Sequence, residues 1–182
     1  MKVFVSPHDD DHALFGAFTC LRERPVLVVV FDGHIQQQRG FRVTAEDRAK
    51  ETAIAADILE CSRVVRLGFS DAVKSPNPAR MFAEIAEHLD WCSVTDWYLP
   101  AIEVDGHHQH NAVGMLNMYA HAVTHYLTYT TKGKSTHGRL VEVERDDWIA
   151  SKLQALSVYK SQMENGLGCR PHFLRSQEEY YL

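Results

Sequence analysis

Short apolar runs alternate along this chain with longer segments in which apolar residues recur at helical spacing. Lys2 to Ser6 and Pro25 to Phe31 are apolar runs, and the second is continuous and β-branched, as in strands that are covered on both faces. Between these runs, from Asp11 to Arg22, leucine and phenylalanine recur every three or four positions, which predicts a helix. The order strand, helix, strand is typical of a parallel sheet with helical connections.

The same alternation continues through the rest of the chain. The further predicted strands are Arg63 to Phe69, Asp96 to Ile102, Tyr126 to Thr131 and Arg139 to Val143. The further predicted helices are Ala45 to Leu59, Ala79 to Leu89, Asn111 to His125, and a last helix that is capped by Asp146 or Asp147 and ends at about Tyr159. The pattern indicates an α/β protein with a single domain over residues 1–182, a Rossmann-like three-layer sandwich with a mostly parallel sheet.

Composition and charge exclude several classes of protein. The net charge is −5 with neutral histidines, so non-specific nucleic-acid binding is not expected. The longest apolar run, Pro25 to Phe31, is far too short to span a membrane, and no signal-peptide pattern is present. The four cysteines are dispersed without a Cys-x-x-Cys pair, which favours a cytoplasmic protein with reduced thiols over a thiolate zinc site. A homo-oligomer stays open.

Two clusters of acidic and histidine residues follow predicted strands. They are His8-Asp9-Asp10-Asp11-His12, after the first strand, and His107-His108-Gln109-His110, after the strand that begins at Asp96. Ligands of α/β proteins bind where strands end. Imidazoles and carboxylates together suit a divalent ion such as zinc, and a bound dication offsets the repulsion between consecutive carboxylates. The two clusters therefore predict a metal-activated hydrolase.

Each cluster also has a simpler explanation when it is considered alone. The acidic residues can start a helix, with Asp9 or Asp10 as the N-cap, and the histidines can lie in a surface loop. Nucleotide binding is a further interpretation of the fold, but no Gly-x-Gly-x-x-Gly follows the first strand, and the acidic run would repel a pyrophosphate. The presence of both clusters at strand ends favours the metal site.

Four segments of the chain resemble the motifs of one known family. They are His8-Asp9-Asp10-Asp11 with Leu14-Phe15-Gly16, Arg48-Ala49-Lys50-Glu51, His107-His108-Gln109-His110 with Ala112-Val113-Gly114, and Lys152, Ala155-Leu156 with Ser161-Gln162. In this order the segments resemble the PIG-L/LmbE-like N-acetylglucosaminyl deacetylases, a zinc-dependent family. The resemblance spans residues 1 to about 165.

The resemblance implies a ligand set and a reaction. By position, it implies that Zn²⁺ or another divalent metal is held by His8, Asp11 and His110. It implies that Asp10 is the general base and that His107 polarises the oxyanion. The reaction that it implies is removal of the N-acetyl group from a small-molecule amino sugar of the N-acetylglucosamine type, or from its conjugate.

Three positions depart from the family's pattern. Gln109 stands where the family usually has Asp, a residue expected to orient or tune the neighbouring histidine, and a neutral amide cannot raise the pKa of His107 electrostatically. His108 replaces the usual proline and adds an alternative ligand. His12 replaces a common acidic residue, and we expect it to be structural or to face the substrate.

Two further residues are candidates for substrate binding. Arg48 can bind substrate oxygen atoms, or it can form a salt bridge on its own helix with Glu51 or Asp47. Asp71 follows a predicted strand and can bind sugar hydroxyls, or it can cap a turn. Two other functions stay open. One is an amidase that acts on a different N-acyl amine with the same site, and the other is a catalytically impaired, metal-dependent binding protein.

Overall fold

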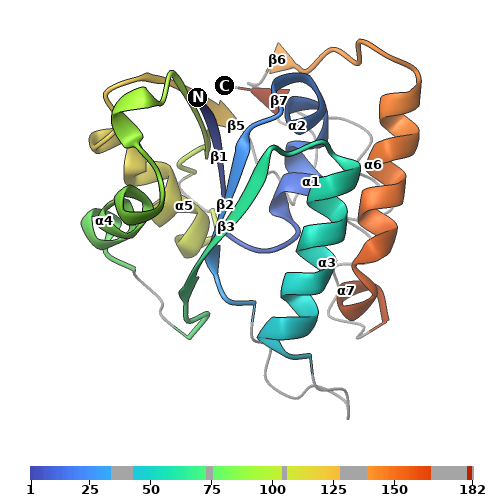
Figure 1. Ribbon diagram of the computed structural model, residues 1–182, viewed down its shortest axis with the longest axis horizontal. Coiled ribbons are helices and arrows are strands. Elements are labelled where there is room, and N and C mark those ends of the chain that lie inside the picture. The colour runs from blue at the N-terminus through green and yellow to red at the C-terminus, as the bar shows by residue number, and fades with distance from the viewer. Residues whose placement is uncertain (34–42, 73–75, 104–105, 128–138, 165–179, 182) are drawn as a thin grey trace.

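A seven-stranded sheet forms the centre of the computed structural model, which describes residues 1–33, 43–72, 76–103, 106–127, 139–164 and 180–181. The strand order is β3-β2-β1-β4-β5-β7-β6 (Figure 1). The parallel strands are β1 (Lys2–Ser6), β2 (Val26–Phe31), β3 (Arg63–Phe69), β4 (Asp96–Pro100) and β5 (Val123–Leu127). The short strand β7 (Tyr180–Tyr181) pairs antiparallel with β5 and with β6 (Arg139–Leu140).

Helices cover both faces of this sheet (Figure 1). One face carries α1 (Asp11–Phe15), α2 (Ala17–Glu23), α3 (Ala45–Ile58), α6 (Asp147–Val158) and α7 (Lys160–Glu164). The other carries α4 (Pro78–His88), α5 (His108–Gly114) and the 3₁₀ helices η1 (Trp91–Ser93) and η2 (Met115–Met118). The predicted Rossmann-like, three-layer architecture is therefore confirmed.

Each face of the sheet has its own apolar core. Every residue of β2 is buried, and successive side chains point to opposite faces. Leu27 and Val29 pack in the core on the α3 and α6 side, whereas Val28 and Val30 pack in the core on the α4 and α5 side. Burial on both faces explains the continuous β-branched run of this strand.

The predicted helix from Asp11 to Arg22 is divided at Gly16, where α1 ends and α2 begins. A Cβ atom at residue 16 would lie 2.2 Å from the ring of Phe4 on β1. The chain therefore passes too close to the sheet to carry a side chain at this position.

The predicted helix from Asn111 to His125 is wrong in its second half. Helix α5 begins earlier, at His108, and ends at Gly114, and the segment Val123–Leu127 forms β5. This strand pairs in parallel with β4, and the pairing depends on a segment distant in sequence. The predicted strand at residues 126–131 overlaps β5 at its first two residues, and the remainder lies outside the described residues.

The remaining predicted helices agree closely with the structure. Helix α3 begins with the predicted signal, because the Thr44 hydroxyl accepts from the Asp47 N–H and the Asp47 carboxylate accepts from the Thr44 N–H. None of the described helices is long and apolar enough to cross a membrane.

Candidate metal centre

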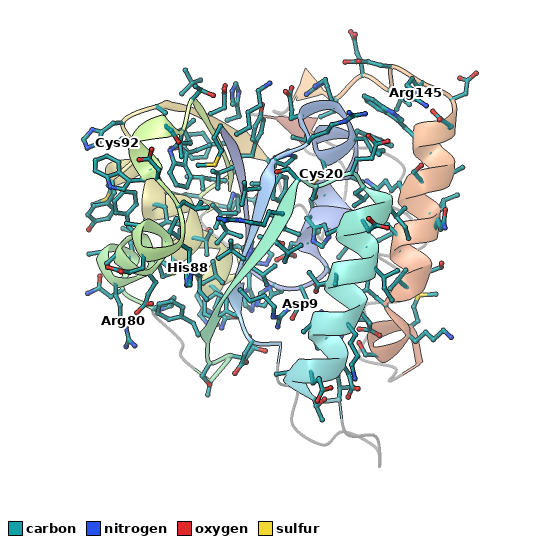
Figure 2. The ribbon with its side chains drawn as sticks, in the orientation of Figure 1. Asp9, Cys20, Arg80, His88, Cys92 and Arg145 are labelled. Atoms are coloured by element: carbon teal, nitrogen blue, oxygen red, sulfur yellow. The ribbon has the colours of Figure 1, made fainter. Side chains whose placement is uncertain are left out.

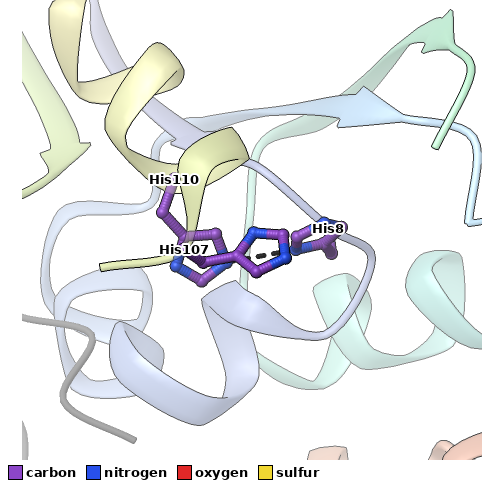
Figure 3. Close-up of side chains that lie close together, drawn as sticks. All are labelled: His8, His107 and His110. Atoms are coloured by element: carbon purple, nitrogen blue, oxygen red, sulfur yellow. Dashed lines mark hydrogen bonds between the residues drawn. The ribbon is translucent and has the colours of Figure 1, made fainter. Parts of the chain in front are cut away.

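The two polar clusters meet at one edge of the sheet. Strands β1 and β4 are neighbours and run parallel, so their carboxyl ends lie side by side. His8 follows β1, while His107 and His110 lie at the start of α5, after β4. Figure 3 shows the three rings converging from these two segments. The fold thus brings together His8 and His110, which are 102 residues apart in the sequence.

Three side chains place one atom each around a common point. His8 Nδ1 lies 3.1 Å from Asp11 Oδ2 and 3.1 Å from His110 Nε2. The third side of this triangle, from His110 Nε2 to Asp11 Oδ2, measures 3.3 Å. The main-chain N–H of His8 donates to Asp11 Oδ2 at 2.8 Å and so fixes the carboxylate. Only 22%, 5% and 11% of the side-chain surfaces of His8, Asp11 and His110 are exposed.

This triangle has the dimensions of a metal-ligand set. In a tetrahedral zinc site with metal–ligand distances of about 2.0 to 2.1 Å, neighbouring ligand atoms lie about 3.3 to 3.4 Å apart. The measured sides of 3.1 to 3.3 Å approach that spacing. Two imidazoles and one carboxylate are also donors that zinc and similar divalent ions accept. The residues at this edge therefore fit a divalent metal ion.

His107 is a third histidine at the same place. Its ring centroid lies 5.3 Å from that of His8 and 5.1 Å from that of His110. One nitrogen from each ring lies within 4.8 Å of the other two, so the three histidines also form a group that could hold a metal ion. His107 is exposed and occupies the N-cap position of α5. It is thus the ring of this group with the best access to solvent.

Asp10 occupies the N-cap position of α1, but its side chain makes no hydrogen bond to the first turn of that helix. Capping therefore does not explain this carboxylate. Its Oδ1 lies 3.5 Å from Arg48 Nη2, and its side chain is 10% exposed. Burial raises the pKa of Asp10, and the nearby Asp11 charge adds to this rise, while Arg48 opposes it without reversing it.

Asp9 has different partners, deep in the interior. It is fully buried, and Figure 2 shows it between the sheet and α3. Thr52 of α3 donates to Asp9 Oδ1 at 2.6 Å, and Arg66 of β3 forms an ion pair with the same carboxylate. The Tyr159 hydroxyl donates to the Asp9 main-chain oxygen at 2.6 Å. Asp9 thus anchors the turn that carries His8 and Asp11. The sequence signal for this contact was the charged Arg66 in the middle of β3.

Arg48 is buried in α3, with 3% of its side chain exposed. Its Nη1 donates to Ser161 Oγ at 3.0 Å and lies 3.3 Å from Glu51 Oε2, so the expected ion pair with Glu51 is present. Asp47 instead completes the cap of α3. The structure therefore connects Arg48 to Asp10 and to helix α7, which carries Ser161.

Asp71 lies after β3, close to the same edge. Its Oδ1 is buried and has no hydrogen-bond partner among the described residues. Burial raises the pKa of Asp71, and the charge of Asp32 adds to the rise, while His8 acts against it. Asp32 Oδ1 accepts from the Asp71 main-chain N–H at 3.4 Å.

Gln109 is buried and contacts His8, the ring of the other cluster. Its Oε1 lies 2.8 Å from His8 Nε2, and its Nε2 donates to the Asp71 main-chain oxygen at 3.2 Å. The sequence led us to expect that residue 109 orients the histidine beside it. The contact instead reaches across the site to a candidate ligand.

The electrostatic environments of the histidines differ. Burial by itself lowers the pKa of His8, but the hydrogen bond and charge of Asp11 outweigh this effect and raise the pKa to about 9. Although His107 is exposed, partial desolvation of its ring lowers its pKa to about 4, and the neighbouring His110 and His8 act in the same direction. For Asp11, burial favours protonation, but His110 and His8 hold the pKa well below its usual range. In the metal-free protein at neutral pH, Asp11 is therefore ionised and His107 is neutral.

His12 and His108 lie apart from the triangle. His12 is fully buried, its Nε2 lies 3.5 Å from the Tyr159 hydroxyl, and burial lowers its pKa to about 4. It is thus a neutral residue of the interior, which agrees with a structural role rather than with contact to substrate. His108 is exposed, and its ring centroid lies 4.6 Å from that of His107.

Comparison with known proteins identifies the fold. No protein-family model matches the sequence, and no curated protein matches it significantly. The structure of N,N′-diacetylchitobiose deacetylase from Pyrococcus horikoshii superposes with a TM-score of 0.73 at 16% identity, over 100% of this chain and 82% of that one. A triple mutant of a deacetylase of the teicoplanin biosynthetic pathway gives 0.67 at 20% identity, over 96% and 88%. This chain has the fold of the LmbE/PIG-L-type deacetylases.

The same fold also carries another reaction. GalB, the 4-carboxy-2-hydroxymuconate hydratase from Pseudomonas putida KT2440, superposes with a TM-score of 0.65 at 14% identity, over 96% of this chain and 84% of that one. The resemblance found in the sequence is therefore confirmed for the fold, and the reaction has to be argued from the site.

Proposed function

We propose that this protein is a metal-dependent hydrolase that removes the N-acetyl group from a small amino sugar of the N-acetylglucosamine type or its conjugate. The observation that carries the proposal is the triangle of His8 Nδ1, Asp11 Oδ2 and His110 Nε2, with sides of 3.1, 3.1 and 3.3 Å. Its place at the carboxyl edge of the sheet suits a ligand site. The deacetylases among the fold neighbours support the reaction class.

In this proposal His8, Asp11 and His110 hold the metal, which is Zn²⁺ or another divalent ion. When bound, the ion supplies Lewis-acid chemistry that activates water and polarises the acetyl carbonyl. The main-chain N–H of His8 keeps the Asp11 carboxylate in place, and the buried Asp9 anchors the turn from below. The ligand set is thus supported by the turn itself before any ion binds.

Asp10 acts as the general base and then as the general acid. It accepts a proton from the water that attacks the acetyl carbon, and it returns this proton to the nitrogen as the C–N bond breaks. The products are acetate and the free amine. Its raised pKa suits both steps, and Arg48 at 3.5 Å holds the carboxylate in place. The burial of Arg48 favours this positioning role over direct contact with the sugar.

His107 stabilises the oxyanion that develops as water attacks. Because its pKa is lowered to about 4, it does so as a neutral imidazole that donates a ring N–H. Asp71 supplies a buried carboxylate oxygen that has no partner among the described residues. A sugar hydroxyl bound by the Asp71 carboxylate would orient the substrate.

Acetate release tests the proposal. The Zn²⁺-loaded protein is incubated with N-acetylglucosamine, N,N′-diacetylchitobiose and N-acetylated amines that lack a sugar, and acetate and free amine are measured. We expect release from the sugars, loss of activity with retained metal in Asp10→Asn, and loss of metal in His110→Ala. Equal metal content in wild type and His110→Ala would overturn the ligand assignment.

The same assay separates the alternatives. Release of acetate from non-sugar amides alone would favour the amidase. Metal binding without turnover of any N-acetyl substrate would favour a metal-dependent binding protein, or a reaction of another class such as the hydration carried out by GalB.

A further inference from the structure

The side-chain amide of Gln109 connects the two segments that carry the candidate ligands with the segment after β3. Gln109 belongs to α5, one residue before His110. Its Oε1 lies 2.8 Å from His8 Nε2, and its Nε2 donates to the Asp71 main-chain oxygen at 3.2 Å. With 4% of its surface exposed, this amide is shielded from competing water.

The contact with Asp71 decides which end of the amide faces His8. The main-chain oxygen of Asp71 is an acceptor only, so the Gln109 NH₂ group must point to it. The amide oxygen then faces His8 Nε2, and this oxygen can only accept. His8 must therefore carry a proton on Nε2.

Once a metal ion takes the place of any proton on Nδ1, the proton on Nε2 leaves Nδ1 as the one nitrogen of the His8 ring that can offer an electron pair. That nitrogen, Nδ1, is the atom that lies 3.1 Å from both Asp11 Oδ2 and His110 Nε2. The ring is thus held with its electron pair toward the centre of the triangle. A histidine that binds metal generally donates its other N–H to a carbonyl or carboxylate, which fixes the tautomer and the ring orientation.

We propose that Gln109 is a positioning residue that selects the Nε2–H tautomer of His8 and so presents Nδ1 to a divalent metal ion. This inference rests on the proposed metal centre. The neutral amide orients the ring without adding a further negative charge to a site that already contains Asp10, Asp11 and Asp71. A carboxylate at this position would orient the ring equally well and would make it a stronger donor.

Metal affinity tests the inference without reference to turnover. The Zn²⁺ dissociation constant is measured by competition with a chromophoric chelator for wild type, Gln109→Leu and Gln109→Glu. Leucine has similar bulk and cannot accept a hydrogen bond, so we expect Gln109→Leu to bind Zn²⁺ about 10- to 100-fold more weakly. Gln109→Glu keeps the acceptor, and we expect it to bind at least as tightly as wild type. Gln154→Leu, the same change at an exposed glutamine of α6, is the matched control and leaves the affinity unchanged.

Nitrogen-15 NMR of the Zn²⁺-loaded proteins supplies a second readout. We expect wild type and Gln109→Glu to show His8 with a metal-bound Nδ1 and an Nε2–H that exchanges slowly with water. In Gln109→Leu this proton should exchange quickly. Circular dichroism of the metal-free variants establishes that each is folded before the affinities are compared.

The outcomes distinguish this inference from the proposed function. If wild type binds no Zn²⁺, the metal centre itself is refuted. If wild type binds Zn²⁺ and Gln109→Leu binds it equally well, the positioning role is refuted and the metal centre stands. Weakened binding in both Gln109→Leu and Gln109→Glu would show that the acceptor is not what matters, which also overturns the tautomer argument.

Discussion

Replacement of Asp9 by alanine tests whether the turn that carries the site is anchored from inside the protein. Asp9 is fully buried and accepts a hydrogen bond from the equally buried Thr52 at 2.6 Å. It is also paired with Arg66 and lies 3.7 Å from Arg48 Nε. The substitution removes the charge and leaves these partners in place, which is the most damaging way to break a buried ion pair.

The expected loss in the free energy of unfolding depends on whether Arg66 and Arg48 can find other partners once Asp9 is gone. Removal of one member of a buried ion pair costs about 3 to 5 kcal/mol. The Arg66 side chain is 24% exposed and can regain water, and Arg48 keeps Asp10 and Glu51 as partners. We therefore expect the lower end of that range, about 3 kcal/mol, which corresponds to a fall in Tm of about 6 to 12 °C for a chain of this length.

The assay is urea unfolding followed by circular dichroism, with a chelator present so that metal binding does not contribute to stability. Asp57→Ala, at an exposed aspartate of α3, is the matched control and should change the free energy of unfolding by no more than about 0.5 kcal/mol. A loss below about 1 kcal/mol in Asp9→Ala would refute the anchoring role, because it would mean that the buried charge is not needed by its partners.

Three further predictions concern the site and its support. Asp10→Asn should keep its metal and lower kcat by about a hundredfold or more, whereas Asp11→Asn should lose both metal and activity; identical metal contents in the two variants would contradict these roles. Gly16→Ala should lower the free energy of unfolding by about 1 to 3 kcal/mol, because the added Cβ would lie 2.2 Å from the Phe4 ring. If the chelator-treated variant is as stable as wild type in urea unfolding, the predicted clash is wrong. Burial by itself raises the pKa of Glu23, but hydrogen bonds from Lys2 and Arg22 and the charges of these two side chains lower it below the usual value. The stability that Glu23 contributes is therefore present above its unfolded-state pKa and is lost as the pH falls through its folded-state pKa. Urea unfolding between pH 6 and 2 should show that the free energy of unfolding falls less steeply with decreasing pH in Glu23→Gln than in wild type. Equal slopes in the two proteins would contradict this role of Glu23.

Much of the fold could be predicted because its signals are local. The buried run of β2 and the capping box of α3 each depend on residues within a few positions of one another. The second half of the predicted helix from Asn111 was wrong because β5 forms by pairing with β4, and the local sequence cannot predict a pairing between separate segments. The need for glycine at residue 16, between α1 and α2, likewise comes from a residue of another element, the ring of Phe4 on β1.

By itself, the sequence determined which residues stand where strands end, and therefore which side chains were available as ligands: His8 and Asp11 after one strand, His110 after another. Only the tertiary structure decided how they meet. The 3.1 Å approach of His8 to His110 depends on the parallel pairing of β1 with β4. The contact between Gln109 and His8 also became visible only in three dimensions, because the two residues are 101 positions apart in the chain. Spacing along a chain fixes which groups can share a turn, whereas contacts between distant segments depend on the packing of the whole sheet.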